Sequence, residues 1–176
     1  MIESIKMQTH LHPRLRTESR PMSTRYLIVS DDLSGAADCA AGFAGAGLNT
    51  AVVLDVQASS SATSAQVLTV DTDSRRDSSE QSAAKLQRVL AAHAPGRTVL
   101  KKIDSTLRGG WASEVATLQK ALRGIALIAP SFPAMNRVMR DGLVYVNGQR
   151  LADTDTWKLE HAHRDDRPAQ MLGDAG

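Results

Sequence analysis

The sequence predicts an α/β fold: a doubly wound, mainly parallel sheet with flanking helices and a C-terminal β-hairpin. Two observations carry this prediction. Short apolar runs rich in Val, Leu and Ile alternate with longer segments of helical character, which is typical of parallel strands joined by helices. Near the end of this alternation, Asn147-Gly148 follows the apolar run 143–146, and this dipeptide is a strong signal for a hairpin turn.

The expected strands are short and end at polar or turn residues. The first run, 26–30, is largely apolar and suits a strand that is buried on both faces. In chain order, we expect parallel strands at 26–30, 50–54, 66–70, 98–103 and 125–129, followed by a hairpin over 143–151.

Three helices are expected between these strands. The first, 34–46, consists mostly of Ala and Gly, so it can lie close to a sheet, and Gly47 is a good terminator. The second spans 78–93 and the third 111–122. No closing element is expected after Thr154, because the tail is polar and has no clear period.

The expected domain organisation is simple. Residues 1–23 are a disordered extension, 24–154 form one domain, and 155–176 are an incomplete or poorly ordered tail of that domain. The N-terminal residues lack the apolar core of a secretory signal, and no apolar run reaches the length of a membrane span, so we expect a cytoplasmic protein.

Composition narrows the function classes. The chain has 176 residues, of which 42% are hydrophobic and 23% charged, as in globular proteins. Its formal net charge is only +2, so we expect no nucleic-acid or membrane partner. The single cysteine excludes a disulfide framework.

Polar clusters follow three of the predicted strands, at the point where each strand ends. They are Ser30-Asp31-Asp32, Asp71-Thr-Asp-Ser-Arg75 and Lys102-Ile-Asp-Ser-Thr-Leu-Arg-Gly109. Ligands of doubly wound sheets bind beyond the carboxyl ends of the strands, so we expect these clusters to meet at one edge. Carboxylates, hydroxyls and cations suit a small polyhydroxylated acid, whose carboxylate an arginine can bind in bidentate fashion.

Each cluster also has a purely structural interpretation. Asp32 or Ser34 can be the N-cap of the first helix, and Arg108 can pair with Asp104. Asp73 can be a solvated loop residue. The functional interpretation is favoured because three clusters coincide with three strand ends.

Asp38 is the most unusual polar residue. It follows Ser34 by about one helical turn, on a helix whose small residues are expected to be buried. A carboxylate in such a place needs a partner or a ligand.

Several familiar sites are excluded. The sequence contains no glycine-rich phosphate-binding motif and no serine nucleophile elbow. No Cys/His spacing suggests zinc, and no metal site is expected. By themselves, the residues predict an α/β domain that binds a polar small molecule.

Taken in order, five segments resemble the N-terminal domain of the four-carbon acid sugar kinase family. They are Ile28-Val-Ser-Asp-Asp-Leu-Ser-Gly-Ala-Ala-Asp38, Asp71-Thr-Asp-Ser-Arg75, Lys101-Lys-Ile-Asp-Ser-Thr-Leu-Arg-Gly109, Ala129-Pro-Ser-Phe-Pro133 and Asp141-Gly-Leu-Val-Tyr-Val-Asn-Gly148. The resemblance spans residues 26–154, and its first and third segments are specific.

The resemblance implies a kinase that uses ATP to phosphorylate the terminal hydroxyl of threonate, erythronate or a 3-oxo-tetronate. It implies that the N-terminal domain holds the sugar acid and that a separate C-terminal domain binds ATP with Mg²⁺. This sequence differs at Asn136-Arg137-Val138, and it stops near the end of the first domain. We therefore expect a chain that is inactive alone, binds no ATP by itself and depends on a separate nucleotide-binding domain or chain.

The resemblance also implies roles for single residues. The expected catalytic residues are Asp32, Asp104 and Arg108: a carboxylate accepts the proton of the attacking hydroxyl, while Arg108 and Lys102 hold the substrate carboxylate or the developing phosphoryl charge. The expected substrate-binding residues are Asp31, Ser34, Asp38, Asp73, Ser74, Arg75, Lys102 and Ser105.

Three other interpretations stay open. The chain can be a non-catalytic module that binds a sugar acid, a nonfunctional remnant of a kinase, or a receiver-like phospho-acceptor. The last leaves the segment Lys101–Gly109 without a role.

Overall fold

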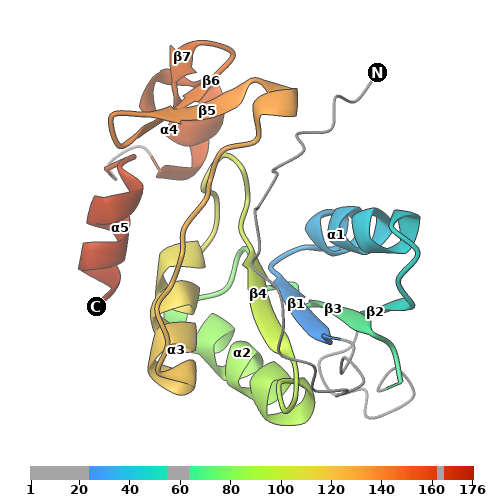
Figure 1. Ribbon diagram of the computed structural model, residues 1–176. Coiled ribbons are helices and arrows are strands. Elements are labelled where there is room, and N and C mark those ends of the chain that lie inside the picture. The colour runs from blue at the N-terminus through green and yellow to red at the C-terminus, as the bar shows by residue number, and fades with distance from the viewer. Residues whose placement is uncertain (1–23, 55–63, 162–164) are drawn as a thin grey trace, which may run out of the picture.

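The computed structural model describes residues 24–54, 64–161 and 165–176 (Figure 1). The extension 1–23, which we expected to be disordered, lies outside these ranges. No helix within them is long and apolar enough to cross a bilayer.

The central sheet has four parallel strands in the order β2-β3-β1-β4, so the predicted fold class is confirmed. Ser30, at the carboxyl end of β1, lies opposite Asp71 on one side and Lys102 on the other. Three strand ends therefore meet at one edge. The strands are β1 at Tyr26–Ser30, β2 at Thr50–Val53, β3 at Val67–Asp71 and β4 at Thr98–Lys102.

Helices cover both faces of this sheet (Figure 1). On one face lies α1 (Leu33–Gly45), and on the other lie α2 (Ser79–His93) and α3 (Trp111–Leu122). Aliphatic side chains form the core between the sheet and α2 and α3, since aromatic residues are scarce. Its buried members are Leu27, Val29, Val53, Leu68, Val70, Leu86, Val89, Leu90 and Leu118.

The start of α1 follows directly from its sequence. Asp32 is the N-cap, and its Oδ1 accepts a hydrogen bond from the Gly35 amide at 2.9 Å. Only Gly35, Ala36 and Ala40 of this helix are buried, because small side chains let it lie directly on the sheet. The rest of the helix is half-buried or exposed to solvent.

A small antiparallel sheet lies beyond the carboxyl end of β4 (Figure 1). We call residues 137–150 the antiparallel arm. It contains β5 (Arg137–Arg140), β6 (Leu143–Val146) and β7 (Gln149–Arg150). The predicted hairpin is confirmed: Asn147 and Gly148 have φ of 51° and 83°, which a tight hairpin turn requires. The first strand of the arm, β5, was not predicted.

The expectation that no element follows Thr154 is wrong. The chain continues into α4 (Asp155–His161) and α5 (Pro168–Ala175). Trp157 and Met171 are buried in a second core with α3 and β6, whose other members include Leu107, Trp111, Val115, Val144 and Leu151. The period is too weak to detect here because the two helices are short and bury only one or two described side chains each.

The expected strand at 125–129 is also wrong. This segment is irregular, and none of its backbone groups is hydrogen-bonded to β4 within the described ranges. Ile125 and Leu127 are 99% and 93% exposed, whereas Ile128 packs against the second core. Within the described ranges the outer edge of β4 stays unpaired, because an apolar run favours a strand but does not determine whether it joins the sheet.

A buried ion pair joins β4 to α3. Lys101 Nζ lies 2.9 Å from Glu114 Oε2, with side chains only 5% and 3% exposed. The other carboxylate oxygen of Glu114 accepts a hydrogen bond from Ser74 Oγ at 2.7 Å. A charge enclosed in this way depends on its partner.

We predict that Glu114→Leu lowers the free energy of unfolding by about 3–5 kcal/mol, because it leaves the Lys101 ammonium buried and unpaired. The double variant Lys101→Met/Glu114→Leu should recover most of this loss. Urea denaturation of the wild type, both single variants and the double variant measures the coupling. A double variant that is no more stable than Glu114→Leu would contradict the prediction.

Candidate functional site

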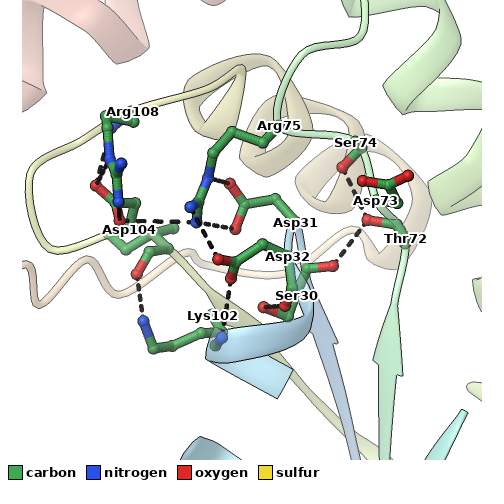
Figure 2. Close-up of polar contacts among 12 residues, drawn as sticks. Ser30, Asp31, Asp32, Thr72, Asp73, Ser74, Arg75, Lys102, Asp104 and Arg108 are labelled. Carbon is green, nitrogen blue, oxygen red and sulfur yellow. Dashed lines mark hydrogen bonds and ion pairs between the residues drawn. The ribbon is translucent and has the colours of Figure 1, made fainter. Parts of the chain in front are cut away.

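The guanidinium of Arg75 joins the three strand ends (Figure 2). Its Nε and Nη2 donate to the two carboxylate oxygens of Asp31 at 2.9 and 3.2 Å, and its Nη1 donates to Asp32 Oδ2 at 2.8 Å. Asp104 Oδ1 lies 3.6 Å from Nη2. Although burial would lower the pKa of Arg75, these partners raise it above its ordinary value.

The loop after β4 is built around Asp104. Arg108 donates to it from Nε and Nη2 at 2.9 and 2.7 Å, and the Thr106 amide and hydroxyl also donate to Oδ2. Burial would raise the pKa of Asp104, but the hydrogen bonds from Arg108 and Thr106 hold it well below its usual range. The predicted ion pair between Arg108 and Asp104 is therefore confirmed.

Close approach of backbone segments requires glycine at two positions. At Gly109, with φ of 75°, a Cβ would lie 3.2 Å from Asp31 Oδ2 and 3.3 Å from the Arg75 carbonyl oxygen. At Gly35, a Cβ would lie 2.6 Å from Ser30 Oγ and 2.8 Å from Asp32 Oδ1. Because glycine has no Cβ, the backbone at both positions can lie this close to the polar side chains of the cluster.

In the turn after β3, the Arg75 side chain points to Asp31 and Asp32, whereas the side chains of Asp73 and Ser74 point away from them. The Ser74 and Arg75 amides both donate to the Asp31 carbonyl, and Thr72 Oγ1 donates to the Ser30 carbonyl. Ser74 is buried and directed to Glu114. Figure 2 shows Asp73 away from the Arg75 guanidinium, so the structure does not join Asp73 to the cluster.

Two further predicted residues also lie outside the cluster. Ser34 and Asp38 are exposed on α1, so the expectation that Asp38 lies on a buried face is wrong. The reason is that α1 buries only its smallest residues. Of the remaining predictions, Lys102 Nζ donates to the Ile103 carbonyl at 2.8 Å, and Ser105 Oγ accepts from Arg137 Nη1 in the antiparallel arm.

The three carboxylates of the cluster differ in accessibility. The side chains of Asp31 and Asp104 are 4% and 11% exposed, and both carboxylates are held by arginines. The Asp32 side chain is 27% exposed, and each of its oxygens accepts a single hydrogen bond. Of the three carboxylates, Asp32 thus has the most capacity to accept a further hydrogen bond, for example from a hydroxyl group.

A cleft of ≈ 1150 Å³ opens beside Arg75 and Arg108. Its walls include the first residues of α2 and α3 and the end of α5. Gly110, the N-cap of α3, has no side chain to bond the first amides of that helix, and it lines the cleft together with Arg75 and Arg108.

A family model described as the sugar-binding N-terminal domain matches residues 26–163. This chain belongs to that family. The resemblance to the N-terminal domain of four-carbon acid sugar kinases is confirmed by relatives that carry the name D-threonate kinase.

The kinase relatives are longer than this sugar-binding domain. The D-threonate kinase of Cupriavidus necator is 47% identical over 137 residues, which cover 77% of this chain and 33% of the relative. That of Bordetella bronchiseptica is 34% identical, covering 72% and 33%. The chain spans about one third of the length of these relatives.

Solved structures share the fold. A domain of unknown function from Bordetella bronchiseptica, crystallised with bound citrate as a domain-swapped dimer, has a TM-score of 0.72 and 29% identity, covering 85% of this chain and 41% of that one. A Haemophilus influenzae protein with 20% identity has a TM-score of 0.70, covers 85% and 38%, and shows the fold alone.

Sequence reasoning missed several residues that shape this sugar-binding domain. Glu114 carried a usable signal, because it lies on the same helical stripe as Trp111, Val115 and Leu118, where a carboxylate needs a partner. Arg137 carried a weaker one, as the departure from the family pattern after the Pro-Ser-Phe-Pro loop. Nothing local pointed to the contact between Arg137 and Ser105.

We predict that Gly35→Ala destabilises the domain by about 1–3 kcal/mol, because its Cβ would overlap Ser30 and Asp32. Gly42→Ala is the matched control in the same helix: it meets nothing within 4 Å and should stabilise the helix by up to about 1 kcal/mol. Urea denaturation of both variants tests the pair. Equal effects would show that α1 does not approach the sheet as closely as described.

The lowered pKa of Asp104 predicts a pH dependence of stability. Its contribution should be present above the unfolded pKa of about 4 and be lost as the pH falls below that value towards the folded pKa. Unfolding free energies measured from pH 6 to pH 3 should fall less steeply for Asp104→Asn than for the wild type. Parallel profiles for the two proteins would contradict the prediction that Asp104 is ionised and stabilised by its hydrogen bonds.

Proposed function

We propose that this chain is the substrate-binding half of an ATP-dependent kinase that phosphorylates the terminal hydroxyl of a four-carbon sugar acid, with threonate the first candidate. The observation that carries the proposal is the polar cluster at three adjacent strand ends, where Arg75 gathers Asp31, Asp32 and Asp104. Clusters at the carboxyl ends of parallel strands are where such sheets bind ligands.

The relatives support this choice of substrate. The names of the three kinase relatives specify D-threonate, a small acid with several hydroxyls. Citrate, bound in the Bordetella bronchiseptica structure, is also a hydroxy acid. Both ligands match a site that offers carboxylates to hydroxyl groups and cations to carboxylates.

Asp32 is the carboxylate we propose to accept the proton of the attacking hydroxyl. It is the most accessible of the three carboxylates and has capacity for another hydrogen bond. Asp104 suits this role less well, because its lowered pKa makes it a weak base and five N–H or O–H groups already donate to it. We assign Asp104 and Asp31 to the positioning of the arginines.

Arg108 retains a free end for a ligand. Its Nε and Nη2 bind Asp104, while its Nη1 has no hydrogen bond among the described residues and its side chain is 33% exposed beside the cleft. We propose that Arg108, with Lys102 nearby on β4, balances the charge that develops during phosphoryl transfer.

ATP and Mg²⁺ supply the phosphoryl group and neutralise its charge in kinases. The described ranges contain no group of three or more His, Cys, Asp or Glu that could hold a metal ion. We propose that a separate domain or chain binds ATP and Mg²⁺.

Calorimetry on the whole chain tests the proposal. We expect heat of binding for D-threonate or D-erythronate, and Asp32→Asn should weaken the affinity roughly tenfold or more, because the Asp32 carboxylate accepts from a substrate hydroxyl. Asp141→Asn, which removes an exposed carboxylate from the β5–β6 turn, is the control. Absence of binding by the folded wild type, or equal affinities for all three proteins, would reject this site.

A further inference from the structure

Arg137 is a half-buried cation that has no charged partner in the part of the chain that the structure describes. It begins β5, and its backbone is fixed: its amide and carbonyl exchange hydrogen bonds with Phe132, and it lies opposite Val146 in the strand register. Its Nη1 donates to Ser105 Oγ, which follows Asp104 in the loop after β4. Its Nε is buried and has no hydrogen-bond partner among the described residues.

The other arginines of the site are different. Arg75 is held by Asp31 and Asp32, and Arg108 by Asp104. Within 24–54, 64–161 and 165–176, no carboxylate is paired with Arg137. A partly desolvated guanidinium needs compensation by an anion, and a free Nε beside a committed Nη1 leaves donors for one.

We propose that Arg137 binds the carboxylate of the sugar acid and so selects acids over neutral polyols. This inference rests on the proposed function of the site. The antiparallel arm then completes the pocket: it brings a cation to the loop that carries Ser105 and Asp104, where Arg75 and Arg108 are already paired with aspartates. Planar guanidinium groups recognise carboxylates through parallel N–H donors, which a lysine cannot reproduce.

The arm is suited to hold this cation rigidly. Two backbone hydrogen bonds to Phe132 and the pairing with β6 fix the start of β5, and Val144 of β6 is buried in the second core. A side chain that is positioned before the ligand arrives loses less conformational entropy on binding.

Calorimetry with two ligands tests the inference on the whole chain. D-threonate carries the carboxylate, while threitol has the same four-carbon skeleton with a hydroxyl in its place. Arg137→Gln should weaken threonate binding at least tenfold, towards the affinity for threitol, and leave threitol binding within twofold of the wild type. Arg137→Lys keeps the charge but loses the parallel N–H donors, so it should lose part of the affinity for threonate.

Arg140→Gln is the matched control. It removes an exposed arginine from the same strand, and it should bind threonate like the wild type. Circular dichroism melts establish that each variant is folded. If Arg137→Gln melts far below the wild type, the comparison of Arg137→Lys with Arg140→Lys decides in its place.

The outcomes separate this inference from the proposed function. If the wild type binds threonate and the Arg137 variants bind it within twofold as tightly, Arg137 does not bind the carboxylate, although the site remains a tetronate site. If no tetronate binds but glycerate or citrate does, and only when Arg137 is present, the substrate is wrong and the carboxylate site stands. If none of these carboxylates binds, both are rejected.

Discussion

The salt bridges of Arg75 are the interaction on which the rest of the site depends. Asp31, Asp32 and Asp104 end or follow neighbouring strands, and three carboxylates at one edge of a sheet would repel one another if left alone. A single guanidinium lies among them, two atoms on Asp31 and one on Asp32, with Asp104 at 3.6 Å. The three carboxylates can therefore lie close together at one edge of the sheet without strong repulsion.

This arrangement divides the polar groups into two kinds. The carboxylate oxygens of Asp31 and Asp104 accept hydrogen bonds from arginines and so define the shape of the site, whereas the Asp32 side chain is more exposed to solvent. The same division applies to the cations, because Arg75 is enclosed by aspartates while Arg108 has a free Nη1 and Arg137 a free Nε among the described residues. Residues with unused capacity are the ones that can exchange partners for a ligand.

Buried polar contacts extend this organisation away from the edge. Glu114 on α3 pairs with Lys101 on β4 and accepts from Ser74, whose backbone amide is bonded to Asp31. The turn that presents Arg75 is thereby anchored to the helical layer. On the other side of the loop after β4, Arg137 ties the antiparallel arm to Ser105, and the second core holds the arm against α3. Two hydrophobic cores, to both of which α3 contributes, thus support one small site.

The sequence by itself determined the features that depend on neighbouring residues: the strands at β1 to β4, helices α1 to α3, the Asn147-Gly148 turn and the three polar strand ends. Apolar period, caps and turn residues are local, so one sequence suffices to read them. Tertiary structure alone decided that Ile125 faces solvent, that Trp157 anchors a helix in the tail, and which carboxylate each arginine binds. Those outcomes depend on contacts between residues distant in the chain, whose geometry and desolvation no local pattern records.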